Sequence, residues 1–449
     1  MDNKRTRVGG GRLVRVAGAL ALAFASLVGG THAAAAFTTC AGPTCFVAPA
    51  DDNYTTPFDA PLTVPAPGVL ANDSGPVGTA VQVADSDTQS WNGATVSVKA
   101  NGSFTYTPDP ANPYSGIDQF DYAIHHGPDD EDFATVYITV VPHLGNDTGY
   151  TQVNQVLNVA APGVFGNDQG IDTTMSPDYS ATSVHGGAVA VNDDGSYQYV
   201  PPSNFSGVDT FTYSQWDIDL DNEYTATVSV YVDSTPPTIS VPVLPAVNLQ
   251  TRFHVGWSGA DALSGVAGYD VNQSAAPWNG NYGAATSIAR ATTATGSDRF
   301  GTYGETYCYS ARAHDRAANV SAWSGRRCTS VPIKATQLTF SSGWATQNSA
   351  AYFGAVARTT ATYGARATRA SIRAKQIWIV VTKCPTCGVV TIRWNGVVKA
   401  NLNLSSPTTR HQQVVSVLAF SAAQNGTLTA TLASHGKSAI IEGLAVNRG

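Results

Sequence analysis

A run of carboxylates in residues 217–223 is the stretch whose chemistry can be named first. Side-chain oxygens stand at every second position, from Asp217, Asp219, Asp221 and Glu223. Ca²⁺ prefers such clustered carboxylate oxygens, but an EF-hand has glycine at the sixth position, where this run has Asn222. Two interpretations stay open: a calcium site, with calcium as the one cofactor to expect, or a solvated hairpin tip.

Basic and aromatic side chains gather toward the end of the chain. Guanidinium groups pair with phosphate and carboxylate, and aromatic rings offer flat faces for stacking. The predicted polymer-binding face consists of Arg366, Arg369, Arg373, Arg393, Arg410, Trp394 and Tyr352. For Trp394, a place in the core is an equal alternative. The expected partner is an anionic cell-wall or extracellular polymer, or a glycan.

The cysteines form three local pairs: Cys40 with Cys45, Cys308 with Cys328, and Cys384 with Cys387. Disulfides persist in exported proteins. Because the N-terminal segment described below has the features of an export signal, we expect each pair to be bonded. The pair Cys384 and Cys387 could instead be a redox motif, but such motifs open a helix. Strand-like segments flank this pair on both sides, which favours a structural clamp.

No catalytic constellation is predicted. The sequence lacks a Gly-x-Ser-x-Gly element before a helix. His125 and His126 stand near Asp129 and Asp130, but in a segment that we expect to be a hydrated turn. An unrecognised hydrolase is a third functional hypothesis, beside the two that are given at the end of this section.

The elements that carry these residues include a tandem repeat. Residues 66–73 (APGVLAND) return as residues 161–168 (APGVFGND), NGSFTY at 101–106 returns as DGSYQY at 194–199, and SGIDQF at 115–120 returns as SGVDTF at 206–211. The offset shrinks from 95 to 91 residues, which is typical of tandem domains with small loop changes.

Strand and turn signals recur through the whole chain. Polar and apolar residues alternate in short runs, as in residues 103–107, which predicts strands with one buried face. The pairs Asn101-Gly102 and Asn395-Gly396 predict two-residue hairpin turns, in which both residues need a positive φ. Together these signals predict an all-β fold of several β-sandwiches.

The three-part repeat resembles the bacterial cadherin-like, Ig-like tandem repeat of the tandem-95 type. This resemblance covers residues 51–233 and implies extracellular β-sandwiches of the kind found in surface and adhesion proteins. Residues 234–333 resemble a fibronectin type III-like domain, carried by Trp257 and by YCYSARA at 307–313. The remainder, with its TKCPTCG element at 382–388, resembles a C-terminal β-sandwich of secreted actinobacterial proteins and implies a jelly-roll-like shape.

These signals divide the chain into six segments. We expect a signal peptide over 1–36, because five basic residues precede an apolar run and four alanines, and a cysteine leader over 37–50. Two cadherin-like, Ig-like repeats follow at 51–142 and 143–233, then the fibronectin type III-like domain at 234–333 and a basic β-sandwich at 334–449. The apolar run is short for a membrane span, so none is expected after cleavage.

Charge differs sharply between these segments. Residues 51–233 carry 25 acidic residues and one basic residue, whereas residues 334–449 carry 12 basic residues and one acidic residue. The sequence therefore predicts a secreted, monomeric, non-catalytic modular protein for cell-surface or matrix interaction, with the basic end docking on anionic polymer. Nucleic acid is not an expected partner of an exported protein. The alternative is a carbohydrate-binding accessory protein for extracellular polymer breakdown.

Overall fold

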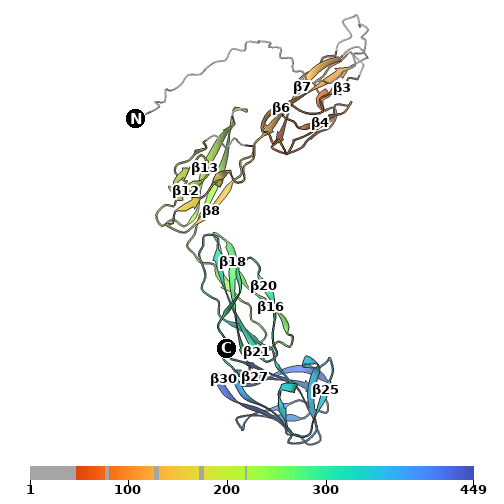
Figure 1. Ribbon diagram of the computed structural model, residues 1–449, viewed down its shortest axis with the longest axis vertical. Helices are drawn as coiled ribbons and strands as arrows, with labels where there is room; N and C mark the ends of the chain where they lie inside the picture. The colour runs from red at the N-terminus through yellow and green to blue at the C-terminus, as the bar shows by residue number, and fades with distance from the viewer. Residues whose placement is uncertain (1–46, 76–79, 126–130, 171–175, 218–219, 449) are drawn as a thin grey trace. The chain divides into compact units, whose positions relative to one another are not determined.

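The structure is a computed structural model that describes residues 47–75, 80–125, 131–170, 176–217 and 220–448. Strands and short loops make up this part of the chain, and its helices are single 3₁₀ turns (Figure 1). The all-β prediction is confirmed. Among the described residues, no helix is long and apolar enough to cross a membrane. The predicted signal peptide and cysteine leader lie almost entirely outside the described residues. Tertiary contacts divide the chain into two compact units, with a boundary that runs through the first repeat.

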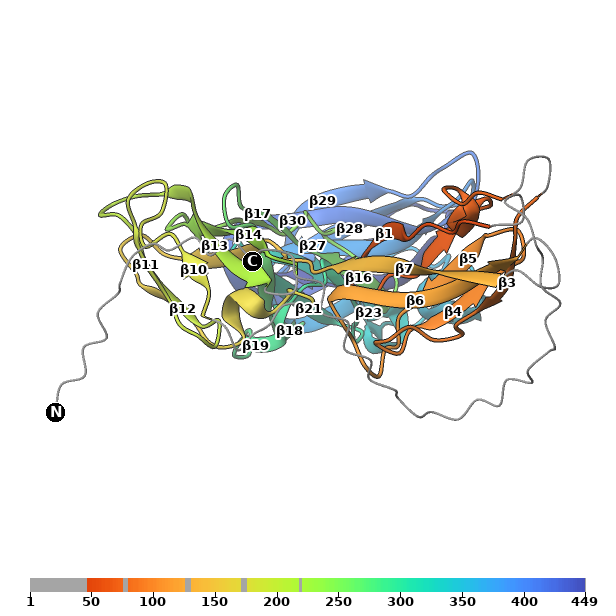
Figure 2. The ribbon, with the colours of Figure 1, turned by 90° about the horizontal axis from the view of Figure 1, so that it is seen from above.

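The first repeat contains two sheets. One sheet has the strand order β1-β7-β6-β3 and the other β2-β5-β4. In Figure 2, β6 and β7 run side by side. The elements are β1 (Asp52–Pro57), β2 (Leu62–Val64), η1 (Gly68–Leu70), β3 (Gln82–Ser86), β4 (Thr95–Val98), β5 (Phe104–Thr107), β6 (Gly116–His125) and β7 (Glu131–Val141).

The second repeat has nearly the same plan. Its sheets have the orders β10-β13-β14-β8 and β11-β12-β9. The elements are β8 (Asp147–Thr151), β9 (Leu157–Val159), η2 (Gly163–Phe165), β10 (Asp178–Tyr179), β11 (Ala188–Val191), β12 (Tyr197–Val200), β13 (Gly207–Asp217) and β14 (Asn222–Val232). Alternate residues of β12, β13 and β14 are buried, among them Tyr199, Phe211 and Val228, so the predicted period of two is confirmed.

Residues 234–333 form the next group of sheets. Their main sheet has the order β19-β18-β21-β22, and β15 pairs with β17 and β16 with β20. The elements are β15 (Thr238–Ser240), β16 (Arg252–Gly256), β17 (Ser258–Ala260), β18 (Val266–Pro277), β19 (Thr286–Thr292), β20 (Gly296–Phe300), β21 (Glu305–Asp315) and β22 (Arg327–Ser330). Trp257 lies in the core of this group and is nearly fully buried.

The C-terminal residues form one hydrogen-bonded sheet of nine strands. Its two longest strands, β27 and β30, carry several register shifts, and such bulges let a long strand bend. The elements are β23 (Ile333–Lys334), which pairs with β31, η3 (Ala335–Gln337), β24 (Thr339–Phe340), β25 (Trp344–Asn348), η4 (Phe353–Ala355), β26 (Val356–Thr360), β27 (Arg366–Lys383), β28 (Val389–Trp394), β29 (Val397–Asn403), β30 (Arg410–Leu432) and β31 (Ala439–Asn447).

One of the two predicted hairpin turns needs correction. In the β28–β29 hairpin both Asn395 and Gly396 have positive φ, as predicted. In the β4–β5 hairpin only Gly102 does. There the Gly102 N–H donates to the Lys99 carbonyl, which makes the loop longer than two residues. The Asn101 side chain accepts from the backbone N–H of Ser103, so the same Asn-Gly pair serves a different turn.

Candidate functional site

A polar pocket beside the Cys308–Cys328 disulfide is the first candidate site. The disulfide joins directly opposed residues of β21 and β22, with its Cα atoms 4.0 Å apart. Strand β18 lies on the other side of β21, and the loop after β18 completes the wall. The pocket encloses about 240 Å³ and is lined by Asn272, Gln273, Ser274, Tyr282, Gly283, Ala285, Cys308, Ser310 and Arg326.

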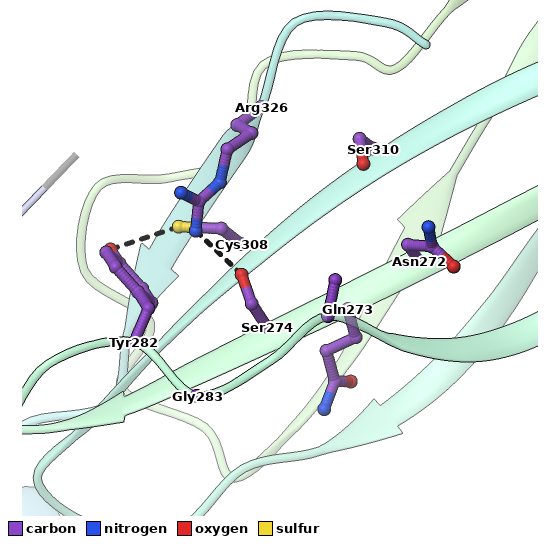
Figure 3. Close-up of a pocket in the computed structure, with 9 residues that line it drawn as sticks. Asn272, Gln273, Ser274, Tyr282, Gly283, Cys308, Ser310 and Arg326 are labelled. Carbon is purple, nitrogen blue, oxygen red and sulfur yellow. Dashed lines mark hydrogen bonds between the residues drawn. The ribbon is translucent and has the colours of Figure 1, made fainter.

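Four side chains converge at one end of this pocket (Figure 3). The Arg326 guanidinium carbon lies 4.4 Å from the centre of the Tyr282 ring. A terminal nitrogen of Arg326 donates to the Ser274 hydroxyl at 2.6 Å. The Tyr282 hydroxyl lies 3.1 Å from Sγ of Cys308, and a disulfide sulfur can only accept this hydrogen bond. The disulfide and the tyrosine together therefore fix the place of the guanidinium.

A second candidate site is a group of three carboxylates. Asp233, Asp261 and Asp315 each offer an oxygen, and these oxygens all lie within 4.8 Å of one another. Asp233 is 0% and Asp315 3% exposed, so this is not a solvated charge cluster. Backbone and side-chain donors hold the group, including Ser264, whose hydroxyl lies 2.7 Å from Asp233. Oxygen donors at this spacing fit the coordination that calcium prefers.

The structure does not bring the four predicted calcium ligands together among the residues that it describes. Asp219 lies outside the described residues. One carboxylate oxygen of Glu223 accepts from the Ser214 hydroxyl at 2.5 Å, and a carboxylate oxygen of Asp217 accepts the backbone N–H of Leu220. Asp221 has a φ of 48°, which is turn geometry. Calcium binding at this hairpin stays a prediction.

Two residues of the predicted polymer-binding face share one side of the C-terminal sheet. Arg366 is paired with Thr431 on β30, which is paired in turn with Thr391 on β28. Arg393 is paired with Thr429, the next outward residue of β30. The intervening residues Ala430, Ile392 and Ala367 are buried on the opposite side. The outer side therefore carries threonines between two arginines, and the hydroxyl oxygen of Thr431 is itself buried.

The other predicted residues lie elsewhere. Trp394 is only 4% exposed and packs on Phe420 in the core, so the proposed face excludes it; this corrects the expectation for Trp394. Arg369 covers the ring of Trp278 at 3.6 Å, and burial lowers its pKa. Arg410 is paired with Lys383 at the far ends of β30 and β27 from Arg366.

Two more residues complete the predicted set. Arg373 donates to the Asn425 side chain at 3.3 Å. Tyr352 donates to Gln347 and meets the His411 ring edge-on at 4.9 Å.

Two of the three predicted disulfides, Cys308–Cys328 and Cys384–Cys387, are confirmed, and Cys40 and Cys45 lie outside the described residues.

A tyrosine network, missed by the sequence reasoning, occurs once in each repeat. In the first repeat the Tyr122 hydroxyl lies within 3.1 Å of Asp52 and Asp73 and 2.8 Å from the Val69 carbonyl. In the second, the Tyr213 hydroxyl lies 2.9 Å from Asp168 and 2.8 Å from the Val164 carbonyl. The repeated Asn-Asp pair was the signal that could have revealed it. The two repeats thus share an internal architecture as well as a sequence pattern.

Comparison with protein-family models agrees with this duplication. Residues 47–142 match the model of the bacterial cadherin-like domain, and residues 141–232 match that of the bacterial Ig domain. The two repeats are a cadherin-like domain and an Ig-like domain. A search of curated proteins returns no match. Bacterial domains of these two kinds are typical of extracellular proteins.

Solved structures give only distant likenesses. One is the CBM36-1 domain of a multidomain xylanase from the hindgut metagenome of Trinervitermes trinervoides, at 16% identity and a TM-score of 0.20, covering 27% of this chain and 98% of that chain. Another is the human desmocollin-1 ectodomain, at 11% identity and a TM-score of 0.21, covering 88% and 72%. A third is the glucan-utilisation protein SGBP-B of Bacteroides ovatus, at 11% identity and a TM-score of 0.18, covering 88% and 94%. TM-scores this low support no statement about the function of this chain.

Proposed function

We propose that the chain is a secreted, non-catalytic surface or matrix protein whose basic C-terminal part binds an anionic polymer. One observation carries the proposal. Glu442 is the only acidic residue among residues 334–449, and it is 0% exposed. Its oxygens accept hydrogen bonds from the backbone of Phe353 and the hydroxyl of Thr382. The surface of this part therefore carries positive charge without carboxylates to neutralise it.

The ion pairs of the described chain agree with this uneven distribution. Those found among the described residues lie within residues 185–314, and none involves an arginine or lysine of the C-terminal sheet. Unpaired guanidinium groups on a sheet face can form forked hydrogen bonds with carboxylate or phosphate groups of a polymer. Arg366 and Arg393, separated by the threonines of β30, are the residues that we assign to this contact. The two disulfides support an oxidising, extracellular location.

The test is binding of the full chain to isolated bacterial cell walls, polygalacturonate and neutral dextran across a salt series. The Debye length falls from about 10 Å at 0.1 M to about 3 Å at 1 M salt, so we expect binding to the two anionic probes to fade. The double variant Arg366→Gln/Arg393→Gln should bind about tenfold more weakly at low salt. Arg252→Gln/Arg290→Gln, which removes the same charge elsewhere, is the matched control.

Two outcomes would contradict this proposal. Equal loss of binding in the control variant would mean that net charge, and not this face, holds the polymer. Salt-resistant binding to dextran would favour the alternative function, a carbohydrate-binding accessory protein for polymer breakdown.

We also propose that calcium stiffens the chain where the Ig-like domain ends. The sequence predicts calcium at residues 217–223, and the donor set of Asp233, Asp261 and Asp315 offers a second place for the ion. Asp233 directly follows β14, and its backbone N–H donates to the Thr151 carbonyl of the Ig-like domain. Its side chain accepts from Ser264, beyond the Thr-Pro-Pro linker. An ion held by these carboxylates would fix both sides of the linker.

A further inference from the structure

The chemistry of the pocket beside Cys308–Cys328 suits an anionic ligand with several hydroxyl groups. Its lining offers the carboxamide of Asn272, three hydroxyls and one guanidinium, and no carboxylate. The Gln273 carboxamide points away from them (Figure 3) and accepts from Arg299. Pockets for drug-sized ligands measure about 300–1,000 Å³. The volume of about 240 Å³ therefore limits the ligand to roughly one ring with its substituents.

Arg326 provides the charge. Its guanidinium is held on one side by the Tyr282 ring and at one nitrogen by Ser274. Within the described part of the chain, no carboxylate forms an ion pair with it. Its remaining N–H groups make no hydrogen bond to another described residue. An arginine whose position is fixed but whose charge is not neutralised can bind an oxyanion with little loss of side-chain entropy.

Tyr282 adds no negative charge to the pocket, and its ring is held in place. Burial raises the pKa of Tyr282, and the positive charges of Arg326 and Arg448 only partly oppose this rise, so the phenol stays neutral at physiological pH. Its hydroxyl hydrogen is directed to the disulfide sulfur. The ring therefore cannot turn to release Arg326 without losing that hydrogen bond.

Polar side chains for the rest of the ligand lie along the neighbouring strands. Asn272 and Ser310 are directly opposed residues of β18 and β21 and form the other end of the pocket (Figure 3). No side-chain hydrogen bond occupies either of them within the described chain. A carboxamide and a hydroxyl side by side can donate to and accept from sugar hydroxyls.

We propose that this pocket binds one uronic acid residue, with the ligand carboxylate on Arg326 and its ring hydroxyls on Asn272 and Ser310. The planar guanidinium edge matches a carboxylate through two parallel N–H···O bonds. The proposal goes beyond polymer binding by the C-terminal sheet, because it concerns a separate site in residues 272–326. It gives the molecule a second, chemically selective contact with an acidic polysaccharide.

The test is titration of the full chain with galacturonic acid, with isothermal calorimetry or NMR of the ligand as the readout. We expect galacturonic acid to bind and galactose, which lacks the carboxylate, to bind at least about tenfold more weakly, as expected for the loss of a charge-assisted hydrogen bond. Arg326→Gln should abolish the difference between the two sugars. Arg326→Lys should retain part of it, because lysine keeps the charge and loses the fork. Arg290→Gln, an exposed arginine outside the pocket, is the matched control.

Three results would overturn the proposal. Galactose could bind as well as galacturonic acid, or Arg326→Gln could bind galacturonic acid unchanged while its near-UV circular dichroism matches that of the wild type. Galactose 6-sulfate could compete equally, which would make the pocket a general oxyanion site. Asn272→Ala provides a second variant that leaves Arg326 and the disulfide in place, and it should weaken galacturonic acid severalfold. Arg366→Gln/Arg393→Gln should leave galacturonic acid binding unchanged, so the failure of one proposal is distinguishable from the failure of the other.

Discussion

At the scale of single residues, each tyrosine network places more hydrogen-bond acceptors around the tyrosine hydroxyl than its single hydrogen can serve. The Tyr213 hydroxyl has one hydrogen, yet two carbonyls and the Asp168 carboxylate lie within 3.2 Å of it. Asp147 stands beside them, and its Oδ2 atom is buried without a hydrogen-bond partner. Burial, and then the charge of Asp168, raise the pKa of Asp147 from 3.8 to about 6.

This raised pKa predicts how the stability of the Ig-like domain depends on pH. Folded Asp147 holds its proton up to a higher pH than the unfolded chain does, so its contribution is fully present below the unfolded pKa and is lost as pH rises through the folded pKa. The melting temperature should therefore rise between about pH 7.5 and about pH 5. Asp147→Asn should remove much of this rise and stabilise the domain by about 1 kcal/mol at neutral pH.

The measurement is scanning calorimetry of wild type and variant over that pH range. Asp178→Asn, an exposed carboxylate of the same domain, should change neither the stability nor its pH dependence. An Asp147→Asn curve parallel to the wild-type curve would show that Asp147 ionises normally in the folded chain.

At the scale of elements, the three parts of the sequence repeat meet in space. The η1 turn lies on the loop of the β4–β5 hairpin, with the Val69 N–H donating to the Gly102 carbonyl at 3.0 Å. The η2 turn repeats this contact through Val164 and Gly195 at 2.9 Å. The third part supplies the strand whose tyrosine hydroxyl donates to the same turn. The pattern recurs because the three segments form one contact.

The glycine of each turn is required by that contact. Gly163 has a φ of 55°, and a Cβ atom there would lie 1.9 Å from the Gly195 carbonyl oxygen. Gly163→Ala should therefore lower the unfolding free energy of the Ig-like domain by about 3 kcal/mol, through backbone strain and displacement of the hairpin. Gly186→Ala is the control, because Gly186 also has a positive φ but nothing lies within 4 Å of its Cβ position. Denaturant unfolding that gives equal losses for both variants would show that strain alone, and not the close contact, requires glycine at 163.

At the scale of the whole molecule, charge and metal binding act on different parts of the chain. Residues 51–233 carry a formal charge of −24 and residues 334–449 a charge of +11. If the basic part binds an anionic polymer as proposed, like charges would repel the acidic residues from that polymer. A divalent cation would reduce the repulsion between clustered carboxylates.

The calcium proposal predicts a change in the thermal stability of the full chain. Millimolar calcium should raise the melting temperature by several degrees relative to chelator, because a ligand that binds only the folded state stabilises it. Asp261→Asn should remove this rise, whereas Asp298→Asn, an exposed carboxylate in the same group of sheets, should keep it. No rise in the wild type would contradict calcium binding, and a rise kept in Asp261→Asn but lost in Asp221→Asn would place the ion at the hairpin instead.

The sequence by itself determined the fold class, the duplicated domain and two disulfide pairs. Alternation of apolar residues determines which side of a strand is buried. Phe104 and Tyr106 point to the same side because they are two residues apart, and both are buried. Proximity in the sequence fixes which cysteines can meet. The excess of basic residues in 334–449 is likewise a matter of composition.

Only the tertiary structure decided which side chains share a site. Arg366 and Arg393 lie on one side of a sheet because β30 is inserted between their strands. Alternation along β27 places Arg369, three residues after Arg366, on the opposite side, and burial removes Trp394 from the surface. Asp233, Asp261 and Asp315 are separated by 28 and 54 residues, and Arg326 meets Tyr282 across 44. Local patterns specify the direction of a side chain from its own backbone, but its neighbours depend on strand order and on the loops between strands, which no short motif in this chain encodes.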